Sequence, residues 1–155
     1  MGTYMSDLFY EPTETNFYPD GKTVRSMEWR KGGLLHRENG KPALIEFWKN
    51  GKVRGKQFFE YGECYREGDL PTSVFYYETG AVRHEIWENA LGWYDRGGDL
   101  PAVITYDRCG DVVRKAWFRK DVNFREGSAP EVEIYENGKL VSFVKSDRVF
   151  EMFNS

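Results

Sequence analysis

The sequence predicts an all-β fold: a repetitive antiparallel meander of β-hairpins with a period of about 29 residues. Two sets of residues recur at this period, and self-similarity with a period of about 20 to 50 residues is the signature of a repeat array. The first set is the loop prolines Pro42, Pro71, Pro101 and Pro130. The second is the turn glycines Gly21, Gly51, Gly80, Gly110 and Gly138. Aromatic residues close each unit at Trp29, Phe58, Trp87 and Trp117.

Each unit contains two apolar runs joined by a short turn. Residues 42–48 form the first run of one unit, residues 49–52 read Lys-Asn-Gly-Lys, and a second run follows. Two β-prone runs joined by an Asn-Gly turn predict a hairpin. A proline that opens a strand is tolerated because it need not donate to the ladder there. We therefore expect little helix, with strands over more than half of the repeat region.

The repeats divide the 155 residues of this single predicted domain into three parts. Residues 1–16 form an N-terminal cap, residues 17–138 the hairpin repeats, and residues 139–155 a C-terminal strand and cap. Terminal units of an array have one uncovered side and need an atypical cap. We expect Met5–Tyr10 to be a cap strand or short helix and Val149–Phe153 to cover the other end.

Alternation within the first strand of each unit assigns its faces. Side chains two residues apart share a face, which places Phe47, Tyr76, Tyr106 and Tyr135 with Ile45, Val74, Ile104 and Glu133. We expect this face to form the core, and Glu133 indicates that the core face is ending there.

An arginine stands five residues before each loop proline: Arg37, Arg66, Arg96 and Arg125. Structurally, each guanidinium would tie its loop to a carboxylate and to backbone carbonyl groups. The expected carboxylates are the adjacent Glu38, Glu67 and Glu126, with Asp99 near Arg96. Functionally, the row would bind phosphates or acidic partners. A residue present in every unit favours the structural interpretation.

The residue after each core-face aromatic lies on the opposite face and changes along the chain. It is aromatic at Tyr18, Trp48 and Tyr77, and acidic at Asp107 and Glu136. Trp93 and Tyr94 interrupt the repeat in another place. Exposed aromatic residues commonly mark interfaces, so we predict that Tyr18, Trp48, Tyr77, Trp93 and Tyr94 bind a partner. The alternative is that the array buries both faces.

Composition excludes several classes of partner and site. The net charge of −3 and pI of about 5.5 provide no global basic field for nucleic acid. No apolar run approaches the ~20 residues that span a bilayer, and the N-terminus lacks a signal-peptide core, so we expect a cytoplasmic protein. Cys64 and Cys109 read as free thiols. No metal-binding spacing is present, and we expect no metal or cofactor.

The segment G-L-L-H-R-E-N-G-K-P-A-L-I-E-F-W-K-N-G-K-V-R, residues 33–54, resembles the MORN-like repeat variants. Such repeats occur in YwqK-type antitoxin proteins of bacteria and in proteins of bacteriophages and large DNA viruses. The resemblance implies a β-hairpin array that binds without catalysis. The sequence departs from it at Tyr65 and Asp95, where the first copy has His36, and at Val113, where earlier copies have Arg25, Arg54 and Arg83.

These observations favour a non-catalytic module that binds a protein and inhibits or neutralises it, as an antitoxin or a phage-encoded inhibitor of host defence would. A lipid- or nucleic-acid-binding surface of MORN type is the alternative. An enzyme that uses the acidic cluster Glu60, Glu63, Glu67 and Asp69 is a third hypothesis. His36 and His84 have no serine or cysteine nucleophile at a recognisable spacing.

Overall fold

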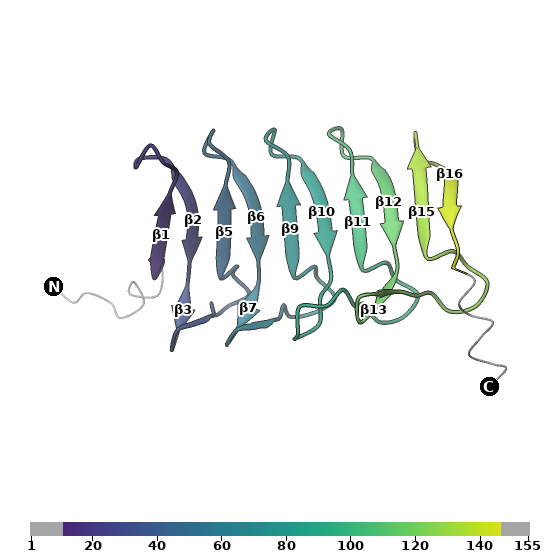
Figure 1. Ribbon diagram of the computed structural model, residues 1–155, viewed down its shortest axis with the longest axis horizontal. Helices are drawn as coiled ribbons and strands as arrows, with labels where there is room; N and C mark the ends of the chain where they lie inside the picture. Colours follow the sequence, from purple (N-terminus) through teal and green to yellow (C-terminus); the bar gives the residue numbers. More distant parts are fainter. Residues whose placement is uncertain (1–10, 147–155) are drawn as a thin grey trace.

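The computed structural model describes residues 11–146, which form one ten-stranded antiparallel sheet without any α-helix. Neighbouring strands follow one another in the sequence, so the sheet is a meander (Figure 1). Its strands are β1 (Glu14–Phe17), β2 (Val24–Glu28), β5 (Leu44–Phe47), β6 (Val53–Gln57), β9 (Ser73–Tyr76), β10 (Val82–Ile86), β11 (Val103–Tyr106), β12 (Val112–Ala116), β15 (Val132–Glu136) and β16 (Lys139–Val144). The predicted all-β hairpin meander is confirmed.

Short two-stranded ribbons continue the second strand of three units. They pair β3 (Arg30–Lys31) with β4 (Leu34–Leu35), β7 (Phe59–Glu60) with β8 (Glu63–Cys64), and β13 (Phe118–Arg119) with β14 (Val122–Asn123). The unit between the last two has a single bridge, Glu88 to Tyr94. Figure 1 shows the ribbons at one end of the strands, the ribbon end, and the tight turns at the other, the turn end.

Backbone geometry explains why the ribbons form. Both central turn residues have positive φ: 47° and 83° at Tyr61 and Gly62, and 49° and 63° at Lys120 and Asp121. Positive φ at both positions characterises the type I′ turn, whose twist matches that of paired strands. Strands nevertheless occupy fewer than half of the described residues. The prediction that they fill most of the repeat region was wrong, because each unit also contains a long irregular loop before its proline.

The turns at the other end share one design. The Trp48 carbonyl accepts a hydrogen bond from the Gly51 N–H at 2.9 Å, and Gly51 has a φ of 82° that glycine adopts readily. The register then shifts by one residue, from Phe47–Val53 to Glu46–Gly55. Arg54 is therefore an extra residue in a β-bulge. The same shift recurs in every hairpin and gives the bulge residues Arg25, Arg54, Arg83, Val113 and Val141.

The buried cluster lies on the face opposite to the one predicted. Ile86, Val103, Ala116 and Val132 are register partners across four adjacent strands and pack together. Tyr76, Tyr106 and Tyr135, on the other face, are only half-buried, although Val74 beside them is buried. The prediction of a single core face was wrong because no second layer formed by residues 11–146 covers this sheet. The side chains on each face are shielded by side chains of the neighbouring strands. At the cluster, Phe118 of β13 packs against them as well.

Polar contacts within the sheet account for the acidic residues on the predicted core face. The Tyr106 hydroxyl donates to Glu85 at 2.5 Å, and the Tyr135 hydroxyl donates to Glu133. Glu133 also accepts from Arg125 at 2.7 Å. Glu133 therefore replaces the apolar residue found at this position in the earlier units, and it is bonded to a tyrosine and an arginine.

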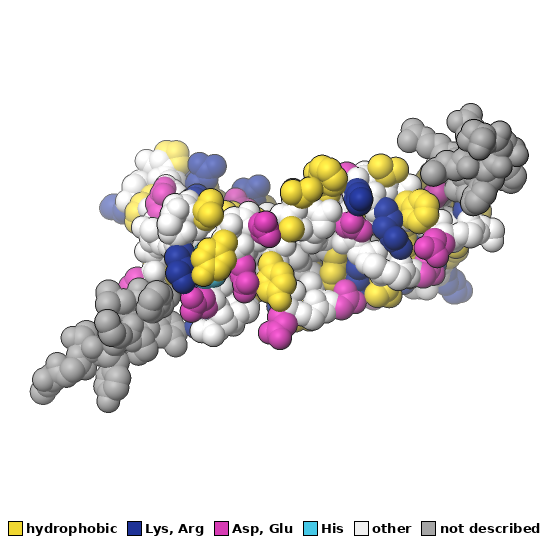
Figure 2. Space-filling model, turned by 90° about the horizontal axis from the view of Figure 1, so that it is seen from below, with side chains coloured by type: hydrophobic (Ala, Val, Ile, Leu, Met, Phe, Trp, Pro, Cys, Tyr) yellow, Lys and Arg dark blue, Asp and Glu magenta, His cyan; other side chains and the backbone are white. Residues whose placement is uncertain are grey.

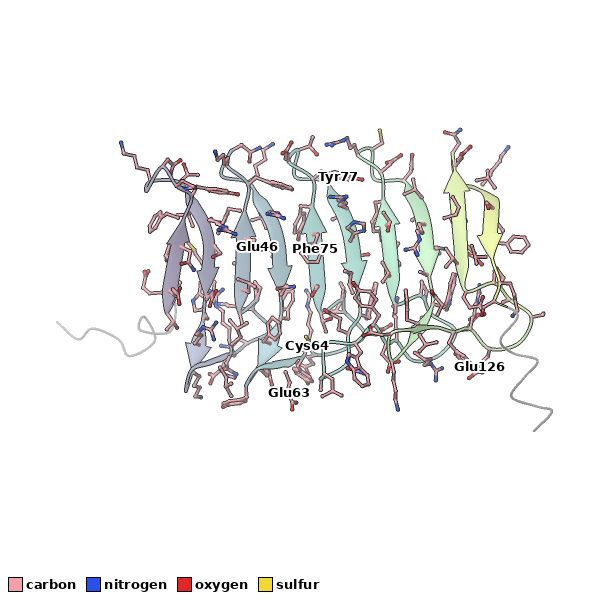
Figure 3. The ribbon with its side chains drawn as sticks, in the orientation of Figure 1. Glu46, Glu63, Cys64, Phe75, Tyr77 and Glu126 are labelled. Carbon is pink, nitrogen blue, oxygen red and sulfur yellow. The ribbon has the colours of Figure 1, made fainter. Side chains whose placement is uncertain are left out.

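The cluster face depends on one close approach of a side chain to the backbone. Phe75 lies against Gly55 of the neighbouring strand, where an added Cβ would stand 2.9 Å from the ring. Figure 3 shows Phe75 in the middle of the sheet, with Glu46 on a nearby strand. Glycine leaves room for the ring here, so a larger residue at position 55 would displace it.

The first and last described strands lie next to the predicted cap segments. β1 begins at Glu14, inside the predicted N-terminal cap, and pairs with β2. β16 is the predicted C-terminal strand, and all six of its residues are exposed. The predicted cap segments Met5–Tyr10 and Val149–Phe153 lie outside the described residues.

Candidate binding surfaces

Each of the four repeated arginines, here called the loop row, is held inside its own unit. Each guanidinium lies over the closing aromatic ring, 3.6 to 3.9 Å from its centroid: Arg37 on Trp29, Arg66 on Phe58, Arg96 on Trp87 and Arg125 on Trp117. Each also donates to the carbonyl of the loop proline five residues later, at 2.9 to 3.2 Å. These contacts support the structural interpretation of the loop row.

Arg96 and Arg125 of the loop row each have a carboxylate partner in the preceding unit, and Arg125 also pairs with Glu133. Asp69 accepts from Arg96 at 2.8 Å, and Asp99 accepts from Arg125 at 2.7 Å. The bond from Arg96 holds the pKa of Asp69 below its usual value, and Arg125 does the same for Asp99.

The predicted partners, the glutamates adjacent in sequence, were wrong. Glu38 pairs with Lys31 and Glu126 with Arg119, while Glu67 has no ion pair with any residue between 11 and 146. Asp99 pairs with Arg125 and not with the nearby Arg96. The loop-row arginines and the glutamates adjacent to them lie in the irregular loops, where the loop of the preceding unit places Asp69 and Asp99 beside the guanidinium groups of Arg96 and Arg125.

Three of the predicted partner-binding residues connect neighbouring units at the turn end. The Tyr18 hydroxyl donates to the Phe47 carbonyl at 2.7 Å, and the Trp48 indole donates to the Tyr76 carbonyl at 3.3 Å. The Tyr77 hydroxyl donates to the Tyr106 carbonyl at 2.8 Å. All three side chains are half-buried.

These bonds also explain why the aromatic column becomes acidic. Asp107 follows Tyr106 at the position equivalent to Tyr77, and a carboxylate has no hydrogen to donate to the next unit. Its Oδ1 instead accepts the N–H groups of Cys109 and Asp111 within its own turn. The change from aromatic to acidic residues is therefore a change of structural role.

The other two predicted residues, Trp93 and Tyr94, lie at the ribbon end. Their exposed fractions are 42% and 36%. The Tyr94 ring packs edge-on against Phe118, with centroids 5.3 Å apart, while its N–H donates to Asp121. The structure therefore separates the five predicted residues into two groups at opposite ends of the strands. Figure 3 shows Tyr77 at the turn end, and Glu63 and Cys64 at the ribbon end.

Trp93 and Tyr94 belong to a larger apolar area that the sequence analysis missed. Here called the ribbon surface, it comprises large side chains at least one-third exposed in the ribbons and the loops beside them: Leu34, Tyr61, Tyr65, Leu70, Leu91, Trp93, Tyr94, Leu100, Val122 and Phe124. Figure 2, viewed from below, shows apolar patches interspersed with acidic side chains on this end. Several of them share a repeat column: Leu34, Trp93 and Val122 stand three residues before a loop-row arginine, and Leu70 and Leu100 directly precede a loop proline. The period therefore contained a signal for this surface that the analysis of strand faces did not use.

Neighbouring ribbons contact one another and hold the ribbon surface in place. The Gly62 N–H donates to the Leu35 carbonyl at 2.8 Å, and the Asp121 N–H donates to the Tyr94 carbonyl at 3.0 Å. The Tyr61 ring stacks on His36 with centroids 4.1 Å apart. The apolar side chains are therefore displayed on a hydrogen-bonded support.

The titratable residues near the ribbons show no catalytic arrangement that we recognise. His36 is buried, and its Nδ1 accepts the Tyr61 N–H at 3.2 Å, which fixes the ring against Tyr61. Burial, with a smaller effect of Glu88, raises the pKa of the Cys64 thiol to about 11, so the thiol stays protonated at neutral pH.

His84 contacts Thr105 at 3.1 Å, and burial, followed by Arg83 and Arg114, lowers its pKa. Both cysteines are free, as predicted.

Within residues 11–146, no group of three or more His, Cys, Asp or Glu side chains could hold a metal ion. The same stretch has no helix long and apolar enough to cross a membrane. No protein-family model, curated protein or solved structure matches the chain.

Proposed function

We propose that this chain is a non-catalytic repeat module that binds a protein through the ribbon surface and inhibits or neutralises it, as an antitoxin or a phage-encoded inhibitor does. The exposure of ten large apolar side chains at one end of the array carries the proposal. Exposed apolar patches rimmed by polar residues are typical of an interaction site on a folded protein. We also propose a cytoplasmic location, consistent with two free thiols.

The composition of the ribbon surface fits a protein partner. Aromatic residues are frequent anchors at protein interfaces, where a polar rim surrounds them. Tyr61, Tyr65 and Trp93 would serve as anchors, and the exposed carboxylates of Glu63 and Glu67 would form part of the rim. The loop row and the aromatic residues of the turn end are engaged within the fold, which leaves the ribbon surface as the larger free apolar area of residues 11–146.

The test compares variants in a binding assay with the partner identified by affinity capture and then purified. Tyr61→Ala combined with Trp93→Ala should weaken binding by about a hundredfold or more, because each removes an exposed aromatic anchor. Phe143→Ala is the matched control, since Phe143 is 61% exposed but lies on β16, away from the ribbons. Equal losses in the two variants, or unchanged affinity in the double variant, would refute the assignment. Urea denaturation establishes that each variant is folded.

A further inference from the structure

A second row of arginines, at the turn end, has the same period as the loop row but different surroundings. Arg25, Arg54 and Arg83 are the bulge residues of the first three hairpins, and all three are exposed. We call them the bulge row. A β-bulge changes the direction of a side chain relative to that in a regular strand. Here the same change occurs at the equivalent position of three consecutive units.

The charges of the bulge row are not neutralised within the fold. None of the three guanidinium groups forms an ion pair with any residue from 11 to 146. Arg54 lies 4.9 Å from the centroid of Trp48, and Arg83 lies 5.6 Å from that of Tyr77. The adjoining turns contain the exposed Lys22, Lys49 and Lys52 together with the exposed Asp20 and Glu78, so they add a net charge of +1.

We propose that the bulge row is a binding site for an acidic polypeptide segment, distinct from the ribbon surface. Guanidinium groups bind carboxylates through paired hydrogen bonds, and an arginine whose donors are free is suited to this geometry. Two strands separate successive units, so neighbouring arginines stand roughly 10 Å apart and the row extends over about 20 Å. A segment of about six extended residues spans that length.

The row ends at the fourth hairpin, where the bulge residue is Val113 and the turn contains Asp107 and Asp111 beside Arg108. Beyond the third unit a ligand carboxylate would meet no bulge arginine, which limits the site to Arg25, Arg54 and Arg83. Exposed charges farther away than a Debye length of about 8 Å contribute little at physiological salt.

A carboxylate ligand fits better than a nucleic acid. Single-stranded nucleic acids bind through aromatic rings that are free to stack on bases. Here Trp48 and Tyr77 are half-buried, bonded to the next unit, and lie beside arginine side chains. The chain also has a net charge of −3, which disfavours a long polyanion that extends past the row.

The experiment measures binding of a fluorescein-labelled oligoglutamate peptide of about ten residues by fluorescence anisotropy. The wild-type chain should bind the peptide, and affinity should fall as salt is raised. Replacing all three arginines by glutamine should weaken binding at least about tenfold, because each exposed ion pair accounts for about two- to fivefold. The matched control is Lys31→Gln, Arg119→Gln and Lys120→Gln, which removes the same charge from the ribbon end and should change affinity less than about twofold.

Three results would overturn the proposal. The wild-type chain fails to bind the peptide, or the control triple variant loses as much affinity as the bulge-row variant. The third result is that an oligothymidine of equal charge, or phosphatidylserine vesicles, binds more tightly than the peptide. The bulge row would then be a site for a nucleic acid or a membrane. The Tyr61→Ala, Trp93→Ala variant should retain peptide binding, so the outcome is independent of the ribbon surface.

Discussion

The loop row and the bulge row contain the same residue type at the same period but use it differently. Arg96 and Arg125 of the loop row are ion-paired and have side chains only 12% and 14% exposed. Arg54 and Arg83 of the bulge row are exposed and have no ion pair among the described residues. Regular spacing in a repeat therefore does not distinguish a structural residue from one that is free to bind. The two kinds of arginine are distinguished by whether carboxylate and carbonyl acceptors of the fold surround the guanidinium group.

The largest effect that the comparison predicts is on Arg125. Arg125→Ala removes the bonds to Asp99, Glu133 and the Pro130 carbonyl. It leaves the largely buried carboxylate of Glu133 without its cation. We expect a loss of about 2–4 kcal/mol of unfolding free energy. Urea denaturation measures it, with Arg66→Ala as the control, because Arg66 lacks an ion pair within residues 11–146 and should lose less. A larger loss of unfolding free energy in Arg66→Ala would contradict the inference that the carboxylate bonds of Arg125 add stability.

A smaller loss is expected where the turn end connects one unit to the next. Tyr77→Phe keeps the ring that lies near Arg83 and removes the bond to the Tyr106 carbonyl. The unfolding free energy should fall by about 0.5–1.5 kcal/mol. Oligoglutamate binding should persist, which would separate the structural role of the ring from the ligand-binding role of the arginine. An unchanged denaturation midpoint would show that the hydrogen bond does not stabilise the array.

Acidic conditions should weaken the ion pairs of the loop row. The pKa of Asp69 is lowered in the folded chain by its bond to Arg96. Its contribution to stability is therefore present above the unfolded pKa of about 3.9 and is lost as pH falls through the folded pKa. Asp69→Asn should flatten the decline of the denaturation midpoint between about pH 5 and pH 2. The control Glu67→Gln, on a side chain without an ion pair among residues 11–146, should leave that decline unchanged, and equal slopes in both variants would argue against the pair.

The smallest effect on stability is expected in the bulge row. Arg54→Ala removes an exposed side chain and its contact with the Trp48 ring. We expect a change within about 0.5 kcal/mol in unfolding free energy. Chemical denaturation measures it alongside Arg125→Ala. Comparable losses in the two variants would mean that both rows are structural.

Much of the fold was predictable because local chemistry determines it. The proline before each first strand and the glycine in each turn define hairpins whichever unit is considered. The free thiols of Cys64 and Cys109 were also predictable, since their columns differ. In contrast, the partners of Arg96 and Arg125 lie 26 or 27 residues earlier, and only the spacing of neighbouring loops in space brings them together.

The candidate binding surfaces were less predictable. Alternation distinguishes the two faces of a strand but does not reveal which face is covered in a sheet of one layer, so the core face was misassigned. Tyr18, Trp48 and Tyr77 appeared free because the acceptors of their hydrogen bonds are backbone carbonyls, which no sequence pattern marks. Tyr61 and Leu91 stand at the same repeat position, five residues before Arg66 and Arg96, but were missed because strands of two residues are too short to show which side chains are exposed by alternation.

Many bonds between units recur at the period of the array. Tyr18, Trp48 and Tyr77 each donate to a backbone carbonyl of the following unit. Every unit provides such a carbonyl, so removing or duplicating one whole unit in the middle leaves the remaining aromatic donors facing an acceptor of the same kind. Inserting one or two residues within a unit would instead displace a donor from its acceptor. Tolerated changes in the length of this chain should therefore come in steps of a whole unit.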